Sequence, residues 1–130
     1  MLSLLFGLID RWRAPAPPPA RVAWLGQQGY AHRGLHDERV PENSLAAFAG
    51  AAVRGLGIEC DVQRSGDGQA VVFHDWELDR LTDASGAVSE RSAAQLGAIR
   101  LKGSEDTIPL LAAVLQQVRG QVPILIEVKS

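Results

Sequence analysis

Short apolar strand-like segments alternate with helix-like segments along the chain, and this alternation limits the possible folds more than any other feature. Four segments have strand character: residues 29–34, 57–63, 69–75 and 122–130. Three segments have helix character: residues 41–55, 92–99 and 109–120. Strands that alternate with helices form βαβ units, so the pattern predicts an α/β fold with a parallel sheet.

Two of the strand segments, AVVF and ILIEV, are apolar without a break. Such runs are typical of strands that are covered on both faces and have neighbours on each side. A sheet of four strands does not supply enough neighbours. We therefore expect the chain to form part of a larger barrel, in which residues at the ends of the strands carry the chemistry.

Capping residues mark the expected helix boundaries. Asn43 or Ser44 suits the start of the first helix, and Gly55 suits its end in a left-handed conformation. Ser92 and Gln95 have the spacing of a capping box. Helical spacing predicts apolar faces at Leu45, Phe48, Ala49, Ala52 and Val53 in the first helix, and at Leu111, Val114, Leu115 and Val118 in the third.

The composition is that of a globular domain, with 46% hydrophobic residues, 22% charged residues and a net charge of −2. A nucleic-acid-binding face needs a surplus of basic residues, so this balance argues against a nucleic-acid partner. Cys60 is the single cysteine and cannot form an internal disulfide. We therefore expect a reducing compartment, with the cytoplasm as the location.

The N-terminal segment, residues 1–13, holds an apolar run of about nine residues, whereas a membrane-spanning helix needs roughly 20. Arg11 and Arg13 follow this run, whereas a secretory signal carries its positive charge before it. We expect a short packed or frayed helix, with a weak membrane-surface anchor as the alternative. The proline-rich residues 14–20 predict a stiff spacer. Residues 1–21 thus form a segment and linker, and the domain covers residues 22–130.

Acidic side chains alternate with apolar ones in two of the strand segments. Side chains alternate across a strand, so Glu59 and Asp61 share a face opposite Cys60, and Glu127 shares a face with Lys129. Carboxylates that converge in a cavity are costly unless something neutralises them. An all-oxygen set suits Ca²⁺ or Mg²⁺, so we expect a divalent cation at Glu59, Asp61 and Glu127. The alternative is that these acids pair with Lys129 and nearby arginines at the surface.

Two histidines lie at predicted strand ends, each next to a charged residue. His32 and His74 suit an acid/base pair, because imidazole exchanges protons near neutral pH. The guanidinium of Arg33 matches phosphate oxygens, and Lys129 adds a point charge. These residues together predict a site for a phosphate ester. His36 lies in the loop before Pro41, where we expect it to be solvated.

Several short motifs follow one another along the chain: HRG, PENS, ECD, VVFHD, LDRLTDASG, IPLL and LIEVK. In this order and spacing they resemble the glycerophosphodiester phosphodiesterase family, from about residue 30 to residue 129. The resemblance implies a (β/α)8 TIM barrel, of which the N-terminal half, about four strands, is present in this chain. It also implies hydrolysis of glycerophosphodiesters, such as deacylated phospholipids, to glycerol 3-phosphate and an alcohol.

The resemblance also implies roles for single residues. By matching motif, it gives roles to His32 and His74 as the catalytic acid/base pair, to Arg33 and Lys129 on the substrate phosphate, and to Glu59, Asp61 and Glu127 on the divalent metal. Glu42 of PENS would orient Arg33 or its loop. Leu110 departs from the family pattern, because the family usually has a capping Thr or Ser after the proline of IPLL.

Two other readings of the chain stay open. One is a truncated, non-catalytic half-barrel that depends on association, because a half-barrel leaves open sheet edges and an uncovered apolar interior. The other is a related barrel phospholipase that also uses two histidines. The Glu-x-Asp and Glu-x-Lys pairs favour the glycerophosphodiesterase over this phospholipase.

Overall fold

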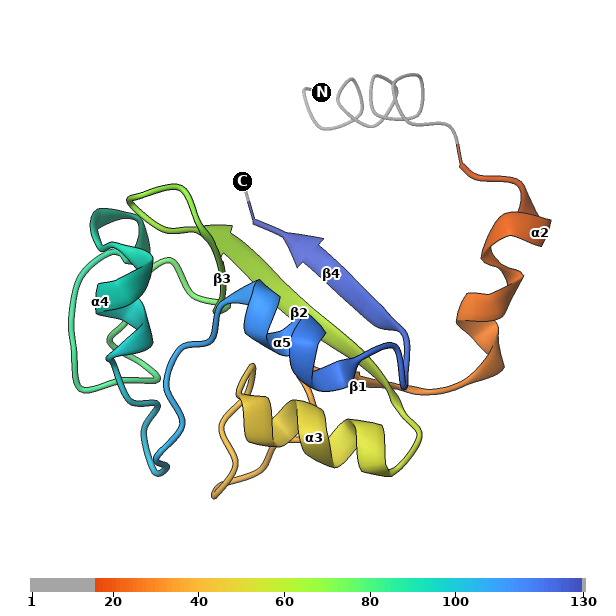
Figure 1. The fold of residues 1–130 in the computed structure, drawn as a ribbon, viewed down its shortest axis with the longest axis horizontal. Helices are drawn as coiled ribbons and strands as arrows, with labels where there is room; N and C mark the ends of the chain where they lie inside the picture. Colours follow the sequence, from red (N-terminus) through yellow and green to blue (C-terminus); the bar gives the residue numbers. More distant parts are fainter. Residues whose placement is uncertain (1–15, 130) are drawn as a thin grey trace, which may run out of the picture.

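A four-stranded sheet forms the centre of the computed structural model, which describes residues 16–129 (Figure 1). The strands are β1 (Tyr30–His32), β2 (Gly57–Arg64), β3 (Ala70–Val72) and β4 (Ile124–Val128). The long strand β2 pairs in parallel with β1 and with β4. The predicted α/β architecture with parallel pairing is therefore confirmed for these three strands, and the prediction for residues 1–13 lies outside the described residues.

The third strand differs from the prediction, because β3 runs antiparallel to the end of β2. The two strands form a hairpin in which Val62 lies opposite Val72, and the Ser65 N–H donates to the Gln69 carbonyl at 2.9 Å. A parallel partner needs a crossover of a dozen or more residues, and the turn between these strands is far shorter. The short turn at residues 65–68, SGDG, therefore determines the direction of β3, although its apolar run suggested a parallel barrel strand.

Helices α3 (Leu45–Val53) and α5 (Leu111–Val118) pack against one face of the sheet (Figure 1). Between β3 and α5 the chain forms η2 (Val88–Glu90) and α4 (Ala93–Gly97). Before β1 it forms α2 (Pro19–Val22) and η1 (Ala23–Gln27). The stiff spacer predicted for residues 14–20 is wrong at its end, where helix α2 begins at Pro19. A proline is tolerated in the first turn of a helix, because the N–H that it lacks would have no partner there. Within residues 16–129, no helix combines the length and apolar character of a membrane span.

The caps of α3 and α4 follow the sequence signals. The Ser44 hydroxyl accepts from the Ala47 N–H at 3.1 Å, and Gly55 has a positive φ of 67° after the helix. Both bonds of the capping box between Ser92 and Gln95 are present. The predicted capping positions are thus confirmed.

The buried face of α3 differs in part from the predicted one. Phe48 is fully buried as expected, but Ala47 and Ala51 are buried with it, and Val53 is 88% exposed. Helix α5 buries Val114 and Val118 as predicted, whereas Leu115 lies on the surface. An alanine-rich helix gives little contrast between its faces, so its spacing alone does not fix which side packs.

The apolar core has two parts. One lies between the sheet and the helices α3 and α5, and it includes Ile58, Cys60 and Val62 of β2. The other gathers around α4 and contains Phe73, Leu96 and Ile108 among its members. The first core determines which face of β2 is turned toward the helices. The remaining side chains of β2 therefore lie on the face of the sheet away from the helices.

The last strand is not covered on both faces as its apolar run suggests. Ile126 is 41% exposed and Val128 is 72% exposed. In the described part of the chain β4 pairs with β2 alone, so these side chains have no further strand beside them.

Leu110 occupies the N-cap position of α5 and its side chain makes no capping hydrogen bond. We predict that Leu110→Thr raises the free energy of unfolding by about 1 kcal/mol, because a hydroxyl there can accept from a free N–H of the first turn. Urea denaturation followed by circular dichroism measures the change. Leu110→Ala is the matched control without a hydroxyl, and equal stability of the two variants would contradict the prediction.

Candidate functional site

Three carboxylates converge on the face of the sheet opposite the core. Glu59, Asp61 and Glu127 each offer an oxygen, and these oxygens lie within 4.8 Å of one another. The register of the parallel strands places Asp61 beside Glu127, and Glu59 is on the same face of β2. The predicted convergence of the three acids is therefore found in the structure.

Cys60 lies between two of these acids in the chain but belongs to the core on the other face. Burial raises the pKa of its thiol to about 12, and the charges of Glu59 and Asp61 add to this shift. The thiol stays protonated near neutral pH. Cys60 is therefore a core residue, in agreement with its place on the strand face opposite the acids.

Asp61 is the buried member of the acidic group and has several partners. Its Oδ1 lies 3.2 Å from Lys129 Nζ, and its Oδ2 lies 3.2 Å from Arg33 Nε. Oδ2 also accepts from Asn43 Nδ2 at 3.0 Å. The Nε–H of Arg33 is not aimed well enough for a hydrogen bond, so charge rather than geometry holds that contact. A carboxylate this deeply buried needs such compensation.

Arg33 sits in a left-handed backbone conformation, with a φ of 57°. Its backbone N–H donates to Glu59 Oε2 at 3.1 Å, and its Nη1 donates to Glu42 Oε1 at 2.9 Å. The contact with Glu42 agrees with the expectation that this residue orients Arg33. Asn43 is also left-handed, with a φ of 56°, and its N–H donates to the Arg33 carbonyl at 2.8 Å. Two strained residues next to one acidic group are typical of a functional site.

Lys129 joins the acids of β2 and β4. Its Nζ lies 2.8 Å from Glu127 Oε1 as well as 3.2 Å from Asp61 Oδ1. The hydrogen bond with Glu127 is the main cause that raises the pKa of Lys129, so the amine stays charged. The pairing of these acids with Lys129 and Arg33, which the sequence left open as an alternative, is thus present together with their convergence.

The two candidate histidines are placed differently. His32 Nε2 lies 3.9 Å from Glu59 Oε2, and the imidazole is largely exposed. His74 does not touch the acidic group, although it was expected at a strand end beside it. It lies just past the antiparallel strand β3, and its Nδ1 is 2.7 Å from Asp75 Oδ1. His36 is exposed, as predicted.

A chain of ion pairs connects His74 with the acids. Arg80 donates through Nε to Asp75 Oδ2 at 2.7 Å and through Nη2 to Glu42 Oε1 at 2.8 Å. Glu42 also binds Arg33, which contacts Asp61. The two histidine-bearing loops are therefore held in one network.

Two carboxylates of this network, Asp75 and Glu42, have a lowered pKa. The hydrogen bond from Arg80 is the main cause that lowers the pKa of Asp75 to about 2. Burial alone would raise the pKa of Glu42, but the hydrogen bonds and charges of Arg80 and Arg33 hold it below its ordinary value. An ionised carboxylate only accepts hydrogen bonds. His74 Nδ1 therefore carries the proton of that bond, which leaves Nε2 to exchange a proton.

Sequence reasoning missed three residues of this site. Asn43 was considered only as a helix cap, whereas its side chain binds Asp61. Arg80 carries no spacing signal, because its partners are distant in the chain. Gln63 lies on the same face of β2 as Asp61, and strand alternation could have indicated it.

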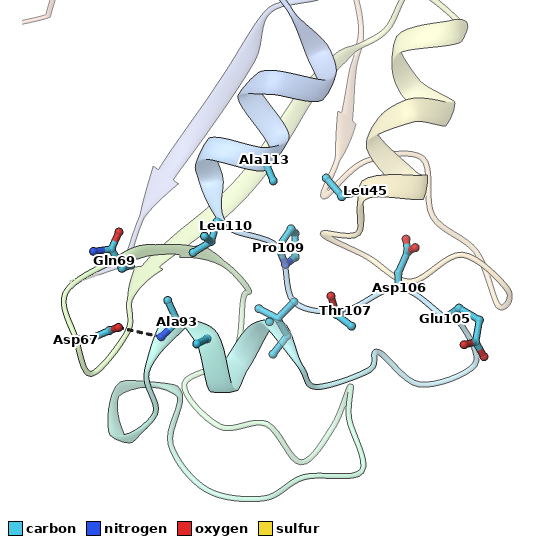
Figure 2. A pocket seen from close by; sticks show the side chains of 13 residues that line it. Leu45, Asp67, Gln69, Ala93, Glu105, Asp106, Thr107, Pro109, Leu110 and Ala113 are labelled. Carbon is cyan, nitrogen blue, oxygen red and sulfur yellow. Dashed lines mark hydrogen bonds between the residues drawn. The ribbon is translucent and has the colours of Figure 1, made fainter.

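An open groove of about 800 Å³ lies between α4, α5 and the start of α3 (Figure 2). Small apolar side chains such as Ala93 and Ala113 line it, with Asp67 and Asp106 at its edges. None of the candidate site residues lines this groove. The chemistry suggested by the sequence therefore belongs to the other face of the sheet.

Glycerophosphodiester phosphodiesterases of other organisms are similar to this chain in sequence. The protein is 37% identical to "Glycerophosphodiester phosphodiesterase 1" of Mus musculus over 123 residues, which cover 87% of this chain and 35% of the mouse protein. It is 39% identical to "Glycerophosphodiester phosphodiesterase" of Bacillus altitudinis over 110 residues, which cover 78% of this chain and 44% of the relative.

Solved structures share its fold. A phosphodiesterase of Oleispira antarctica, in complex with the product sn-glycerol-3-phosphate, matches with a TM-score of 0.75 and 33% identity over 83% of this chain and 47% of that one. The glycerophosphodiester phosphodiesterase of Agrobacterium tumefaciens matches with a TM-score of 0.70 and 34% identity, over 79% of this chain and 47% of that one. These neighbours are TIM-barrel enzymes, so the described α/β sheet is part of such a barrel.

The chain spans less than half the length of these relatives and neighbours. The sequence profile named "Glycerophosphoryl diester phosphodiesterase family" matches residues 32–130, a range that contains every candidate site residue. The motifs that suggested the resemblance lie within the matched range. The chain belongs to the glycerophosphoryl diester phosphodiesterase family.

Proposed function

We propose that this chain carries the metal-binding and phosphate-binding part of an enzyme that hydrolyses glycerophosphodiesters to glycerol 3-phosphate and an alcohol. The observation that carries the proposal is the approach of Glu59, Asp61 and Glu127 to within 4.8 Å, with Arg33 and Lys129 against the same acids. Family membership supports the reaction class. It also favours this reaction over that of a related two-histidine phospholipase.

The donor set fits a hard divalent cation. Three carboxylates supply oxygen ligands alone, which suits Ca²⁺ or Mg²⁺ better than zinc. The connected network holds five carboxylates, namely Glu42, Glu59, Asp61, Asp75 and Glu127, and three cations, namely Arg33, Arg80 and Lys129. With neutral histidines the negative charges therefore exceed the positive ones by two in this network, which a divalent cation would balance.

A bound cation would polarise a phosphoryl oxygen and stabilise the charge that develops there. Arg33 would hold the phosphate through its planar donors, and Lys129 would add a point charge beside it. Both side chains contact Asp61, which supports a phosphate position beside the acidic group. The complex of the Oleispira antarctica enzyme with sn-glycerol-3-phosphate supports a phosphate ester of glycerol as the ligand.

The two histidines would move the protons of the reaction. One imidazole would take a proton from the nucleophile, and the other would give one to the leaving alcohol. The nucleophile is water or the neighbouring glycerol hydroxyl, which would give a cyclic phosphate first. His32 beside Glu59 and the Nε2 of His74 are the proposed groups.

A non-catalytic half-barrel is the second candidate. It would associate through the exposed side chains of Ile126 and Val128, on a strand whose outer edge is unpaired in the described residues. A half-barrel of this kind would bind the cation but would not hydrolyse the substrate. Cation binding and product release therefore have to be measured separately.

The first prediction under this proposal concerns the cation. Calorimetric titration with Ca²⁺ and with Mg²⁺ should show binding, and Glu127→Gln should weaken it at least about tenfold, because one ligand charge is lost. Glu127 is more than half exposed, so the substitution should leave the fold intact. Glu105→Gln is the matched control, since Glu105 pairs with Arg100, outside the site. Equal affinity of both variants, or turnover in the presence of EDTA, would contradict the proposal.

The next prediction concerns proton transfer. His32→Ala and His74→Ala should each lower the rate of glycerol 3-phosphate release from glycerophosphocholine by at least ~10²-fold. His36→Ala should leave the rate unchanged, because His36 is exposed in a loop. Near-normal rates for the first two variants would reject their roles. Cation binding by the wild-type chain without any product release would favour the non-catalytic half-barrel.

A further inference from the structure

Gln63 is a buried polar side chain that no step of the proposed reaction uses. It follows Asp61 by two residues on β2, so both side chains lie on the same face. Its Nε2 donates to the Phe73 carbonyl at 2.8 Å and to the Asp75 carbonyl at 2.8 Å. An amide nitrogen has two hydrogens, and each of these contacts uses one.

The two carbonyls that Gln63 binds are those on either side of His74. The segment that carries His74 follows the end of β3 and lies outside the strand ladder. The Phe73 N–H donates to the Asp61 carbonyl at 3.0 Å, which adds a third contact with β2. The backbone around His74 is thus attached to the strand that carries Glu59 and Asp61.

Side-chain contacts hold the imidazole of His74 in addition to these backbone contacts. Its Nδ1 lies 2.7 Å from Asp75 Oδ1, and Asp75 receives two hydrogen bonds from Arg80, at 2.7 and 3.0 Å. These contacts set the tautomer and the rotation of the ring, and they depend on the backbone of Asp75, whose carbonyl Gln63 binds. They do not fix the distance between the ring and the acids, which depends on where the backbone lies.

We propose that Gln63 is a positioning residue for His74, because its amide fixes the backbone on both sides of the histidine to the strand of the acidic group. Gln63 acts through His74 and does not touch the reacting atoms. The kinetic consequence rests on the proposed function, whereas the effect on the His74 ring does not. Catalytic geometry is sensitive to such support, since a shift of about 1 Å can cost about 10²-fold in rate.

Gln63→Met removes both donors and keeps the charge and the approximate length of the side chain. Gln69→Met is the matched control, since Gln69 is exposed on the turn of the same hairpin. The readout is the nitrogen-15 spectrum of the imidazole rings, recorded at about pH 8. The chain has three histidines, so single substitutions assign the signals. We expect the Nδ1–H signal of His74 to broaden or to shift toward the other tautomer in Gln63→Met only, with His32 unchanged.

The kinetic readout separates a positioning role from a general structural one. Gln63→Met should lower kcat by about 10- to 10²-fold, and KM and the affinity for Ca²⁺ should change by less than about twofold. Unchanged His74 ring signals in Gln63→Met would overturn the inference, even if the variant melts at a lower temperature. If His74→Ala leaves turnover unchanged, the proposed function fails, while the ring signals still report on Gln63.

A measurement without substitution covers the case in which Gln63→Met does not fold. Scalar couplings across hydrogen bonds should join Gln63 Nε2 to the carbonyl carbons of Phe73 and Asp75 in the wild-type chain. Gln63→Asn keeps an amide on a shorter side chain, so it should reach fewer of these carbonyls. Its His74 ring signals should lie between those of the wild type and those of a histidine in a disordered loop. Absence of both couplings would overturn the inference.

Discussion

The parallel register between β2 and β4 is the constraint on which the candidate site depends. It places Asp61 beside Glu127, and alternation along β2 adds Glu59 to the same face. A slip by one residue would turn Glu127 to the other face and break the group. The core resists such a slip, because Ile58 and Val62 are packed beneath the helices and Ile124 packs against the same core. Packing on one face of the sheet thus determines the chemistry of the other.

The acids can stay together only because the chain surrounds them with cations and amide donors. Asp61 is nearly inaccessible and has Arg33, Lys129 and Asn43 as partners. The loop after β1 supplies two of these three partners, and it does so in a strained left-handed conformation at both residues. Strain of this kind costs about 1–3 kcal/mol for each residue. The contacts with a buried carboxylate are the compensation that keeps the loop in this shape.

Strand alternation was the most reliable signal in the sequence. It gave the correct face to Glu59, Asp61 and Glu127, and it assigned Cys60 to the core. Helical spacing failed for Val53, and the alternation of strands with helices failed for the direction of β3. The alanine-rich α3 has little contrast between its faces, and a two-faced apolar run does not tell a parallel strand from an antiparallel one. The contacts of Arg80 were beyond prediction, because they join loops that are close only in the folded chain.

The antiparallel hairpin has a consequence for the position of the second histidine. A parallel β3 would have carried His74 to the end of a separate strand. In the antiparallel pairing, Val72 lies opposite Val62, so the chain runs back along β2 and the Phe73 N–H reaches the Asp61 carbonyl. The hairpin therefore returns His74 to the level of the acids that precede it in the sequence. The two histidines are thus brought beside β2 by different routes, His32 at the end of the neighbouring strand β1 and His74 just after the hairpin strand β3.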